Sequence, residues 1–278
     1  MKKISRRSFM DAAAVSVAAL ALTACGGSAS SAASSVASSA ASSEAASSAA
    51  AAELTTVEAG KLTMATNAAF PPYEMTTDAG EFEGIDVDTA KAIAEKLGLE
   101  LQIDDMDFDA ALLSVQQGKA DIVMAGVTVT DERKAVMDFS DSYATGIQSI
   151  IVPEGSDITS PDDLAGKKIG TQRGTTGYIY CSDDFGDDAV VAYDDGLTAV
   201  QALNNGQVDA VVIDNAPAKE FVAANPGLVI LDTSYAEEDY AIGLAKGSAL
   251  EDAVNAALEE LKADGTLQSI VDKYINAE

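Results

Sequence analysis

Short apolar segments of strand character alternate with helical segments from Lys61 onward, and this alternation constrains the fold more than any other feature of the sequence. In 86–97, apolar residues recur at the three- and four-residue spacing of a helix face, and Gly98 follows as a stop. The first half is predicted to contain strands at 61–66, 99–103, 121–125 and 148–152, and helices at 86–97, 109–117 and after Thr130. Such alternation predicts parallel sheets with helices on both faces.

The alternation begins a second time at Lys168. The second half is predicted to contain strands at 168–171, 190–193, 210–213, 229–231 and 240–245, and helices at 176–180, 197–203, 218–223 and 249–275, the last broken at Gly265. Roughly 220 ordered residues can form one domain, but the restart of the pattern favours two α/β lobes. Ligands of such sheets bind beyond the carboxyl ends of the strands. Two facing lobes would therefore hold a ligand in a cleft between them.

The first 53 residues are predicted to lie outside the fold. Residues 1–24 have a basic start and an apolar run at 12–22, too short to cross a bilayer of about 30 Å, as in a secretory signal peptide. Leu22-Thr23-Ala24-Cys25 resembles a lipobox, so we expect cleavage before Cys25 and lipidation of its thiol. The alternative is ordinary cleavage with an incidental cysteine. Residues 25–53 are almost entirely Ser and Ala and are expected to form a flexible tether.

The route of export has two interpretations. Ser5-Arg6-Arg7-Ser8-Phe9-Met10 resembles the twin-arginine export signal, and the alternative is a general secretory signal that carries two arginines. Both routes end outside the cytoplasm. We therefore expect an extracytoplasmic protein that its lipid anchors to the outer face of the cell membrane.

The composition excludes several classes of function. A formal charge of −28 argues against nucleic-acid binding, because phosphate contacts need a basic surface. The absence of histidine removes the His-dependent triads and the usual zinc ligand sets. The acidic run 183–188 does not match the EF-hand spacing, so we expect no metal and no cofactor. After Cys25, Cys181 is the second cysteine of the chain, so no disulfide is expected within the mature domain.

Arg133 is the first candidate for ligand binding. Thr130 is predicted to cap a helix whose first turn contains Asp131 and Glu132, which places Arg133 at the third helical position. A cation there opposes the helix macrodipole, and such local conflicts tend to mark functional sites. If the guanidinium turns back to the strand end, it can bind a carboxylate together with backbone N–H groups. The alternative is an exposed arginine that pairs with Glu132 or Asp131.

Two further candidates follow predicted strands of the second half. Gly174-Thr175-Thr176-Gly177 opens a helix and lacks the phosphate-loop pattern, but its glycines and hydroxyls can present donors to a carboxylate. The alternative there is a simple capped turn. Asp214 follows the buried strand 210–213, and Asn215 is predicted to cap the next helix, which would leave Asp214 free to pair with an ammonium. The alternative is that Asp214 is itself the cap.

Two aromatic residues stand at the starts of loops that follow predicted strands. Phe70 belongs to Phe70-Pro71-Pro72-Tyr73-Glu74, where the prolines stiffen the loop, and Phe108 follows the second strand. Both are candidates for apolar walls of a binding site. The alternative is that they belong simply to the core, as aromatic residues more often do.

Taken together, these stretches resemble the polar amino-acid family of ABC-transporter solute-binding proteins, bacterial extracellular solute-binding protein family 3. The resemblance covers 62–275 and rests on Ala65-Thr66-Asn67-Ala68-Ala69-Phe70-Pro71-Pro72-Tyr73-Glu74, Gly84-Ile85-Asp86-Val87-Asp88, Ala125-Gly126-Val127-Thr128-Val129-Thr130-Asp131-Glu132-Arg133, Asp138-Phe139-Ser140-Asp141, Gly174-Thr175-Thr176-Gly177, Asp209-Ala210-Val211-Val212-Ile213-Asp214 and Lys262-Ala263-Asp264-Gly265-Thr266. It implies a periplasmic-binding-protein-like fold of two lobes, each a mostly parallel sheet flanked by helices, with a two-strand hinge near 143–147 and 237–241. The implied limits are 54–144 with 241–278 for lobe 1, and 145–240 for lobe 2.

The resemblance also implies how the two charged ends of an amino acid would be held. Arg133 would bind the α-carboxylate with help from Gly126, Thr128 and Thr176. Asp214 would bind the α-ammonium.

For the ligand side chain, the resemblance implies a sandwich between Phe70 and Phe108, with Asn67 and Gln172 near its tip. Many relatives carry Asp where this chain has Asn67. Because the amide lacks the charge that would meet a cationic side chain, this difference favours a neutral ligand.

We therefore expect a monomeric lipoprotein that captures a free, polar or neutral amino acid by lobe closure and delivers it to the permease subunits of an ABC importer, without catalysis. One alternative is an arogenate or prephenate dehydratase-like enzyme on the same fold. Without histidine, carboxylates such as Asp214 or Glu74 would have to serve as its acid or base. The other alternative is a ligand-sensing ectodomain. Because the chain stops at Glu278 with no transmembrane helix or signalling domain, sensing would require a separate partner.

Overall fold

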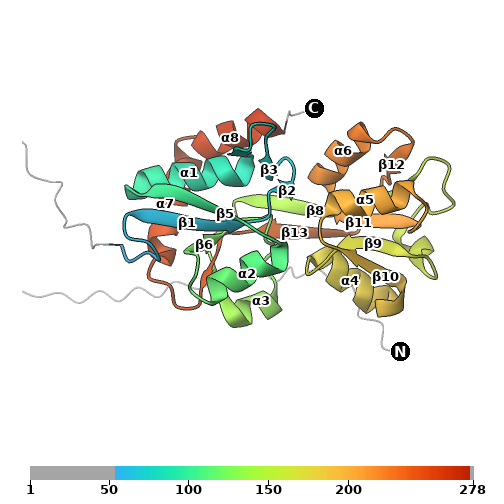
Figure 1. Ribbon diagram of the computed structural model, residues 1–278, viewed down its shortest axis with the longest axis horizontal. Helices are drawn as coiled ribbons and strands as arrows, with labels where there is room; N and C mark the ends of the chain where they lie inside the picture. The colour runs from blue at the N-terminus through green and yellow to red at the C-terminus, as the bar shows by residue number, and fades with distance from the viewer. Residues whose placement is uncertain (1–53, 276–278) are drawn as a thin grey trace, which may run out of the picture. The chain divides into compact units, whose positions relative to one another are not determined.

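Two large sheets with helices packed around them form residues 54–275, the part of the chain that the computed structural model describes (Figure 1). This is the predicted two-lobe α/β fold. The predicted signal peptide, the lipidation site Cys25 and the tether lie outside the described residues. None of the helices within 54–275 combines the length and the apolar character that crossing a membrane would require.

The first sheet has the strand order β5-β1-β6-β14-β7. Its strands are β1 (Lys61–Thr66), β5 (Glu100–Asp105), β6 (Ile122–Val123), β7 (Met137–Phe139) and β14 (Gly243–Ala245). β1 is parallel to β5 and β6, whereas β14 is antiparallel to β6 and β7. Leu62 and Met64 of β1 are fully buried, together with the residues between and after them. Burial of both faces explains why β1 carries no charged side chain after Lys61.

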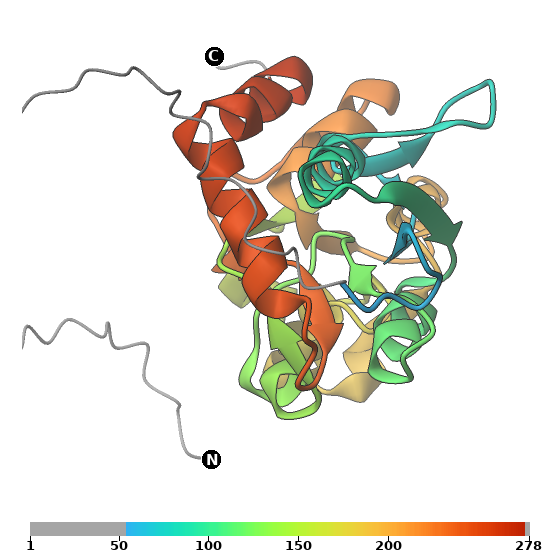
Figure 2. The same ribbon diagram turned by 90° about the vertical axis from the view of Figure 1, so that its left-hand side faces the viewer.

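Helices cover both faces of this sheet, with α1 and α8 on one side and α2 and α3 on the other (Figure 1). These helices are α1 (Ile85–Leu97), α2 (Phe108–Gln116), α3 (Asp131–Val136), α7 (Glu251–Ala263) and α8 (Thr266–Tyr274). α1 forms because Ala90, Ile93 and Ala94 recur on one face and are buried there, and it ends before Gly98 as predicted. Figure 2 shows α7 and α8, in red, along one side of this lobe. Both contact α1.

The second sheet has the order β10-β9-β11-β8-β12, and β13 also pairs with β8. Its strands are β8 (Ala144–Pro153), β9 (Ile169–Gln172), β10 (Val190–Tyr193), β11 (Ala210–Asp214), β12 (Leu228–Ile230) and β13 (Ala236–Tyr240). Its helices are α4 (Thr176–Phe185), α5 (Gly196–Asn204) and α6 (Asn215–Ala224), with short 3₁₀ helices η1 (Pro161–Leu164) and η2 (Asp187–Ala189). β9, β10 and β11 are parallel, and β8 is antiparallel to its neighbours. The three parallel strands come from the predicted restart of the alternation.

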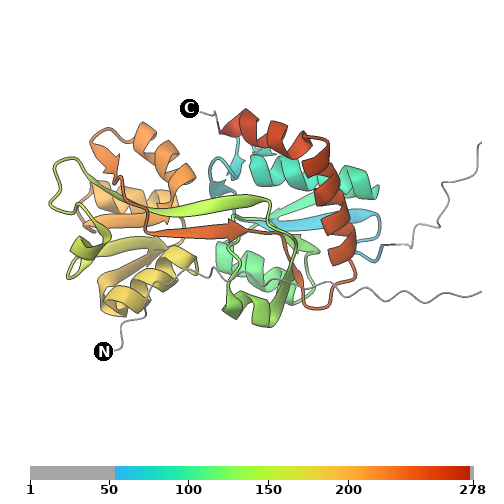
Figure 3. The ribbon, with the colours of Figure 1, turned by 180° about the vertical axis from the view of Figure 1, so that it is seen from behind.

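Two long strands, β8 and β13, run side by side from one lobe to the other (Figure 3). They pair antiparallel, from Ala144 opposite Tyr240 to Gln148 opposite Ala236. These are the two crossings near 143–147 and 237–241 that the family resemblance implies. Because two paired strands resist shear but can bend and twist, this connection suits a hinge.

The structure differs from the predicted elements in several places, and the strand β7 and the 3₁₀ helices η1 and η2 were not predicted. The strand predicted at 240–245 is split, because β13 ends at Tyr240 in the second sheet and β14 begins at Gly243 in the first. A small three-stranded sheet, β2-β3-β4, was not predicted; it comprises β2 (Ala69–Phe70), β3 (Glu74–Thr76) and β4 (Phe82–Glu83). Strands of two or three residues are too short to show a period in the sequence.

Candidate ligand-binding site

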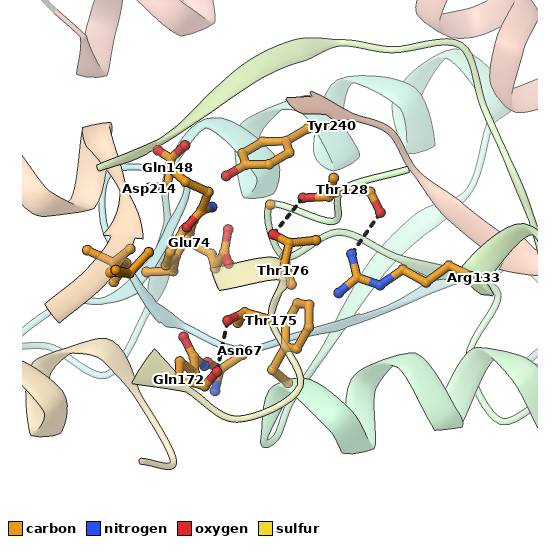
Figure 4. A pocket seen from close by; sticks show the side chains of 16 residues that line it. Asn67, Glu74, Thr128, Arg133, Gln148, Gln172, Thr175, Thr176, Asp214 and Tyr240 are labelled. Atoms are coloured by element: carbon orange, nitrogen blue, oxygen red, sulfur yellow. Dashed lines mark hydrogen bonds between the residues drawn. The ribbon is translucent and has the colours of Figure 1, made fainter. Parts of the chain in front are cut away.

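A pocket between the two lobes is lined by all nine residues that the sequence singles out for ligand binding (Figure 4). These nine are Asn67, Phe70, Phe108, Gly126, Thr128, Arg133, Gln172, Thr176 and Asp214. The remaining lining residues are Glu74, Ala125, Gln148, Thr175, Val212, Ile213 and Tyr240. Its position follows from the topology, since the strand ends β1, β9 and β11 face this space. That these side chains contact a ligand remains a prediction.

Arg133 is buried in this pocket, with only 8% of its surface exposed. The Thr130 hydroxyl accepts a hydrogen bond from the Arg133 backbone N–H at 3.2 Å, which confirms the predicted cap. The guanidinium turns back, as expected, and its Nη1 donates to the Thr128 carbonyl at 2.7 Å. Its Nη2 donates to the Gly174 carbonyl of the other lobe at 3.2 Å. The alternative of an exposed arginine paired with Glu132 or Asp131 is therefore wrong.

The guanidinium of Arg133 retains hydrogen-bonding capacity. Two of its five N–H donors are used by the two carbonyl groups. Its central carbon lies over the Phe108 ring, 5.3 Å from the ring centroid. Burial lowers the pKa of Arg133, and the nearby Glu238 carboxylate opposes this effect. Because a buried cation is costly unless an anion compensates it, this arrangement favours an anionic group in the pocket.

Glu238 is a buried acid next to the pocket-lining residues Thr128 and Gln148, and the sequence analysis did not single it out. It is 6% exposed, and its Oε2 accepts from the Thr128 hydroxyl and from the Gln148 amide, each at 3.0 Å. The Thr128 and Thr176 hydroxyls approach to 3.5 Å across the cleft. The signal for Glu238 lies in the alternation of β13, where positions 238 and 240 are buried and positions 237 and 239 are exposed. A buried acid on a connecting strand is the kind of local conflict that tends to mark a functional site.

The start of α4 brings backbone and hydroxyl groups to the pocket. Thr175 caps the helix by accepting from the Tyr178 N–H at 3.3 Å, and Thr176 follows as the first helical residue. Gly174 has a φ of +73°, and a Cβ there would collide with the Asp109 carboxylate of the other lobe. Glycine is therefore required at this position for both its conformation and the close approach of the lobes. The capped turn exists, and it also lines the site.

Asp214 lines the pocket from the side opposite Arg133 (Figure 4), but the predicted helix cap is wrong. Asp214 itself caps α6, because its Oδ1 accepts from the Ala216 N–H at 3.0 Å, whereas Asn215 donates to the Ser149 hydroxyl. Its Oδ2 accepts from the Ile147 N–H of β8 at 2.7 Å. The strand end leaves Asp214 in an extended conformation that suits a cap.

The surroundings of Asp214 shift the pKa of its carboxyl group in both directions. Burial raises its pKa to about 6, while the N–H groups of Ala216 and Ile147 and the Tyr240 hydroxyl favour the ionised form. At neutral pH the carboxylate is therefore mostly charged. Each carboxylate oxygen has more than one lone pair, so both oxygens can still accept from an ammonium.

Asn67 and Gln172 join the two lobes directly. The Gln172 amide donates to Asn67 Oδ1 at 2.8 Å, and the Asn67 amide donates to the Met106 carbonyl at 2.9 Å. Phe70 lies near them and stacks on Tyr73 with a centroid distance of 5.8 Å. The predicted side-chain end of the site therefore has one apolar wall and two amides that already bond each other.

Glu74 is the most unusual lining residue. Its side chain is fully buried, and neither carboxylate oxygen has a hydrogen-bond partner among residues 54–275. Burial raises its pKa well above the usual range, and Asp86 adds to this effect. In the sequence, Glu74 stands out only as a possible acid of the enzyme alternative. No group of three Asp, Glu, Cys or His side chains suited to a metal occurs in the described part of the chain.

Comparisons with known proteins identify the family of this chain. Residues 62–277 match the model of the bacterial extracellular solute-binding proteins, family 3. The chain is 34% identical over 275 residues to a probable histidine-binding protein of Neisseria gonorrhoeae, covering 96% of this chain and 95% of that protein.

Two solved structures are similar over most of this chain. An ancestral arginine-binding protein bound to glutamine has 42% identity and a TM-score of 0.75, covering 78% of this chain and 99% of that one. The arginine-, lysine-, histidine-binding protein ArtJ of Geobacillus stearothermophilus has 35% identity and a TM-score of 0.75, covering 78% and 96%. The fold is thus shared with proteins that bind amino acids.

Proposed function

Because this chain belongs to family 3 of the bacterial extracellular solute-binding proteins, we propose that its cleft captures a free amino acid outside the cytoplasm for an ABC importer. The observation that carries this proposal is the placement of Arg133 and Asp214 on opposite sides of one pocket. A free amino acid is a zwitterion, with a carboxylate and an ammonium on the same carbon atom. A cation and an anion that share one small cleft complement both groups.

The contacts available are strong enough to explain capture. The unused N–H donors of Arg133 and the Thr176 hydroxyl face the α-carboxylate in this proposal, and Asp214 faces the α-ammonium. Hydrogen bonds to charged groups contribute roughly 1.5–3 kcal/mol each. Three or four of them approach the free energy of about −8 kcal/mol that corresponds to a dissociation constant near 1 μM.

Two observations disagree about the ligand side chain. Asn67 carries no charge and supports a polar or neutral ligand, as does the relative bound to glutamine. Glu74 is a buried carboxyl without a partner, and it supports a cationic side chain, as does the relative that binds arginine, lysine and histidine. We propose a polar side chain, with neutral ligands as the first candidates and cationic ligands as the second.

The same proposal covers the rest of the molecule. Lobe 1 comprises 54–144 and 241–278, lobe 2 comprises 145–240, and closure of the lobes on the ligand produces the form that the permease recognises. The signal peptide and the lipid on Cys25 place the monomer on the outer face of the membrane. The ligand is bound and released unchanged, since relatives of this chain are binding proteins.

Calorimetry with the twenty amino acids tests this function. The protein is first unfolded and refolded to remove any ligand carried through purification. We expect at least one amino acid to bind with a dissociation constant below about 100 μM, and no binding to any of them contradicts the proposal. Mass spectrometry of the recovered ligand should show no chemical change. Turnover of arogenate or prephenate supports the enzyme alternative, and co-purification with a kinase instead of a permease supports the sensor.

A further inference from the structure

Two buried carboxyl groups, Glu74 and Asp86, stand together behind one wall of the cleft. Glu74 opens β3 and lines the pocket, and Asp86 is the second residue of α1. Both side chains are fully buried. The Asp86 N–H donates to the Tyr73 carbonyl at 2.9 Å, so the backbone holds the start of α1 against the residue before Glu74.

The hydrogen bonds of this pair are incomplete if both groups are ionised. Asp86 Oδ2 accepts from the Gly126 N–H at 3.0 Å, and Gly126 is itself a lining residue. Asp86 Oδ1 and both oxygens of Glu74 have no donor among residues 54–275. Two ionised carboxylates have no proton to offer each other. One proton between them would supply the missing donor.

We propose that Glu74 and Asp86 share one proton at neutral pH, and that a ligand with a cationic side chain displaces this proton when it enters the cleft. This inference rests on the proposed amino-acid binding at the same site. It makes Asp86 a positioning residue that sets the charge of Glu74, although Asp86 does not line the pocket.

The surroundings offer no cation that would let both groups ionise. The titratable groups that act on the pair are Tyr73, Tyr143 and Asp105, which are two phenols and an acid. Neither carboxyl takes part in a salt bridge within the described residues, and Arg133 uses two of its donors on the Thr128 and Gly174 carbonyls. In a low-dielectric interior, two adjacent negative charges without a counter-charge are strongly disfavoured.

The proton belongs mainly to Glu74. Burial raises the pKa of both groups, to about 6 for Asp86 and well above the usual range for Glu74. The Gly126 N–H and the Tyr143 hydroxyl favour the ionised form of Asp86. Glu74 accepts no such bond. Asp86 is therefore the carboxylate of the pair, and Glu74 is the carboxylic acid.

A shared proton resolves the disagreement about the ligand side chain. A protonated Glu74 presents one O–H donor and one carbonyl acceptor, which suits an amide or a hydroxyl. An ionised Glu74 presents a carboxylate, which suits a guanidinium or an ammonium. A neutral ligand can thus bind without any change at the pair. A cationic ligand binds with the release of up to one proton to solvent.

The first half of the proposal is tested without ligand by infrared spectroscopy of the full secreted chain at neutral pH. We expect a carbonyl band of a protonated carboxyl group that disappears in Glu74→Gln. In Asp86→Asn the band should persist but shift, because burial keeps Glu74 protonated while its neighbour becomes an amide instead of a carboxylate. Asp88→Asn, on the same helix but in an exposed pair with Lys273, is the matched control and should leave the band unchanged. Identical spectra of wild type and Glu74→Gln overturn the sharing of a proton.

The second half is tested by calorimetry with L-arginine and L-glutamine in phosphate and in Tris, whose ionisation enthalpies differ. Near pH 7, Asp214 is already mostly ionised, so the difference between the two amino acids reports on the pair. We expect arginine to release close to one proton more than glutamine, and its dissociation constant to rise by about tenfold per pH unit as the pH falls. In Glu74→Gln the difference should vanish, because the group that releases the proton is absent, and in Asp88→Asn it should persist.

Equal proton release with both amino acids overturns the coupled step. Binding of neither probe also rejects it, while the infrared result still decides whether the proton is shared. The proposed function fails only if none of the twenty amino acids binds, so the two failures are distinguishable.

Discussion

Arg133 and Asp214 are both held in place by backbone groups before any ligand is considered. Arg133 donates to two carbonyls, and Asp214 accepts from two N–H groups. Such bonds fix the orientation of each charged side chain and lower the conformational entropy that is lost when a ligand binds. Each group keeps further donors or acceptors for that ligand. At the scale of single residues, the site is therefore preorganised.

Arg133→Lys should weaken amino-acid binding by about 10- to 100-fold. Lysine keeps the positive charge but lacks the planar guanidinium group, which can donate two parallel hydrogen bonds to a carboxylate. Calorimetry measures the change. Arg173→Lys is the matched control, since Arg173 is the other arginine of the folded part and is 56% exposed. Equal effects of the two substitutions would contradict the role of Arg133.

Asp214→Asn removes the charge of this residue and keeps its shape. The amide oxygen can accept from the Ala216 N–H or from the Ile147 N–H but not from both, so we expect the free energy of unfolding to fall by about 1–3 kcal/mol. Amino-acid affinity should fall by about 30- to 100-fold, because the ammonium loses its counter-charge. Asp195→Asn, at the exposed cap of α5, is the control and should leave affinity unchanged.

The pH dependence of binding at Asp214 has a definite sign. Burial raises the pKa of this carboxyl to about 6, and only the ionised form pairs with an ammonium. The affinity for a neutral amino acid such as glutamine should therefore be constant above about pH 7 and fall as the pH drops through 6. Affinity that stays constant down to about pH 5 would contradict the pairing of Asp214 with the ligand.

At the scale of elements, the two connecting strands carry a close contact that fixes how they cross. A Cβ at Gly146 of β8 would lie 2.5 Å from Cζ of Tyr240 on β13. Tyr240 is almost fully buried, lines the pocket and packs edge-on against Tyr73 at 5.3 Å. The absence of a side chain at Gly146 therefore lets an aromatic ring sit between the hinge and the ligand site.

Gly146→Ala should reduce the free energy of unfolding by about 1–3 kcal/mol, the usual effect of overpacking a buried contact. Because Tyr240 would have to move, ligand affinity should fall as well. Urea unfolding and calorimetry measure the two effects. Thr145→Ala is exposed on the same strand and should change stability by less than about 0.5 kcal/mol. Unchanged stability of Gly146→Ala would show that the ring moves freely.

At the scale of the whole molecule, buried acids make stability depend on pH. Burial raises the pKa of Asp86 and Asp214 to about 6, and that of Glu74 also rises. A carboxyl with a raised pKa binds its proton more tightly in the folded chain. Its stabilising contribution is full below the pKa of the unfolded chain, near 4, and is lost as the pH rises through the folded pKa.

We therefore expect the ligand-free protein to be more stable near pH 5 than near pH 8, by a few kcal/mol, at about 1.4 kcal/mol per unit of pKa and group. The surface carboxyls Asp138 and Asp264 have lowered pKa values and act in the opposite direction, but solvent screens them. Urea unfolding across this range measures the effect. Asp214→Asn should make the free energy of unfolding less dependent on pH, and Asp195→Asn should leave its pH dependence unchanged. Stability that rises toward pH 8 contradicts this account.

Several parts of the site could be predicted because their signals are local. A few residues of sequence suffice to recognise the start of a helix. Thr130 and the turn at Gly174 complete such starts, whereas Arg133 places a cation where the helix dipole disfavours it. The alternation of strands and helices predicted the two lobes in the same way. The exchange of roles between Asp214 and Asn215 was not predictable, because either residue can cap a helix and only the backbone conformation selects one.

By itself, the sequence determined the order of the elements, the two-lobe fold and the set of side chains at the strand ends, since periodicity, caps and turns act over a few residues. Only the tertiary structure decided which acids are buried together. Glu74 and Asp86 are 12 residues apart and on different elements, and Glu238 meets Thr128 and Gln148 through the crossing of two strands. Burial and counter-charge are properties of packed neighbours, so charge in this cleft follows from the fold and not from any local pattern.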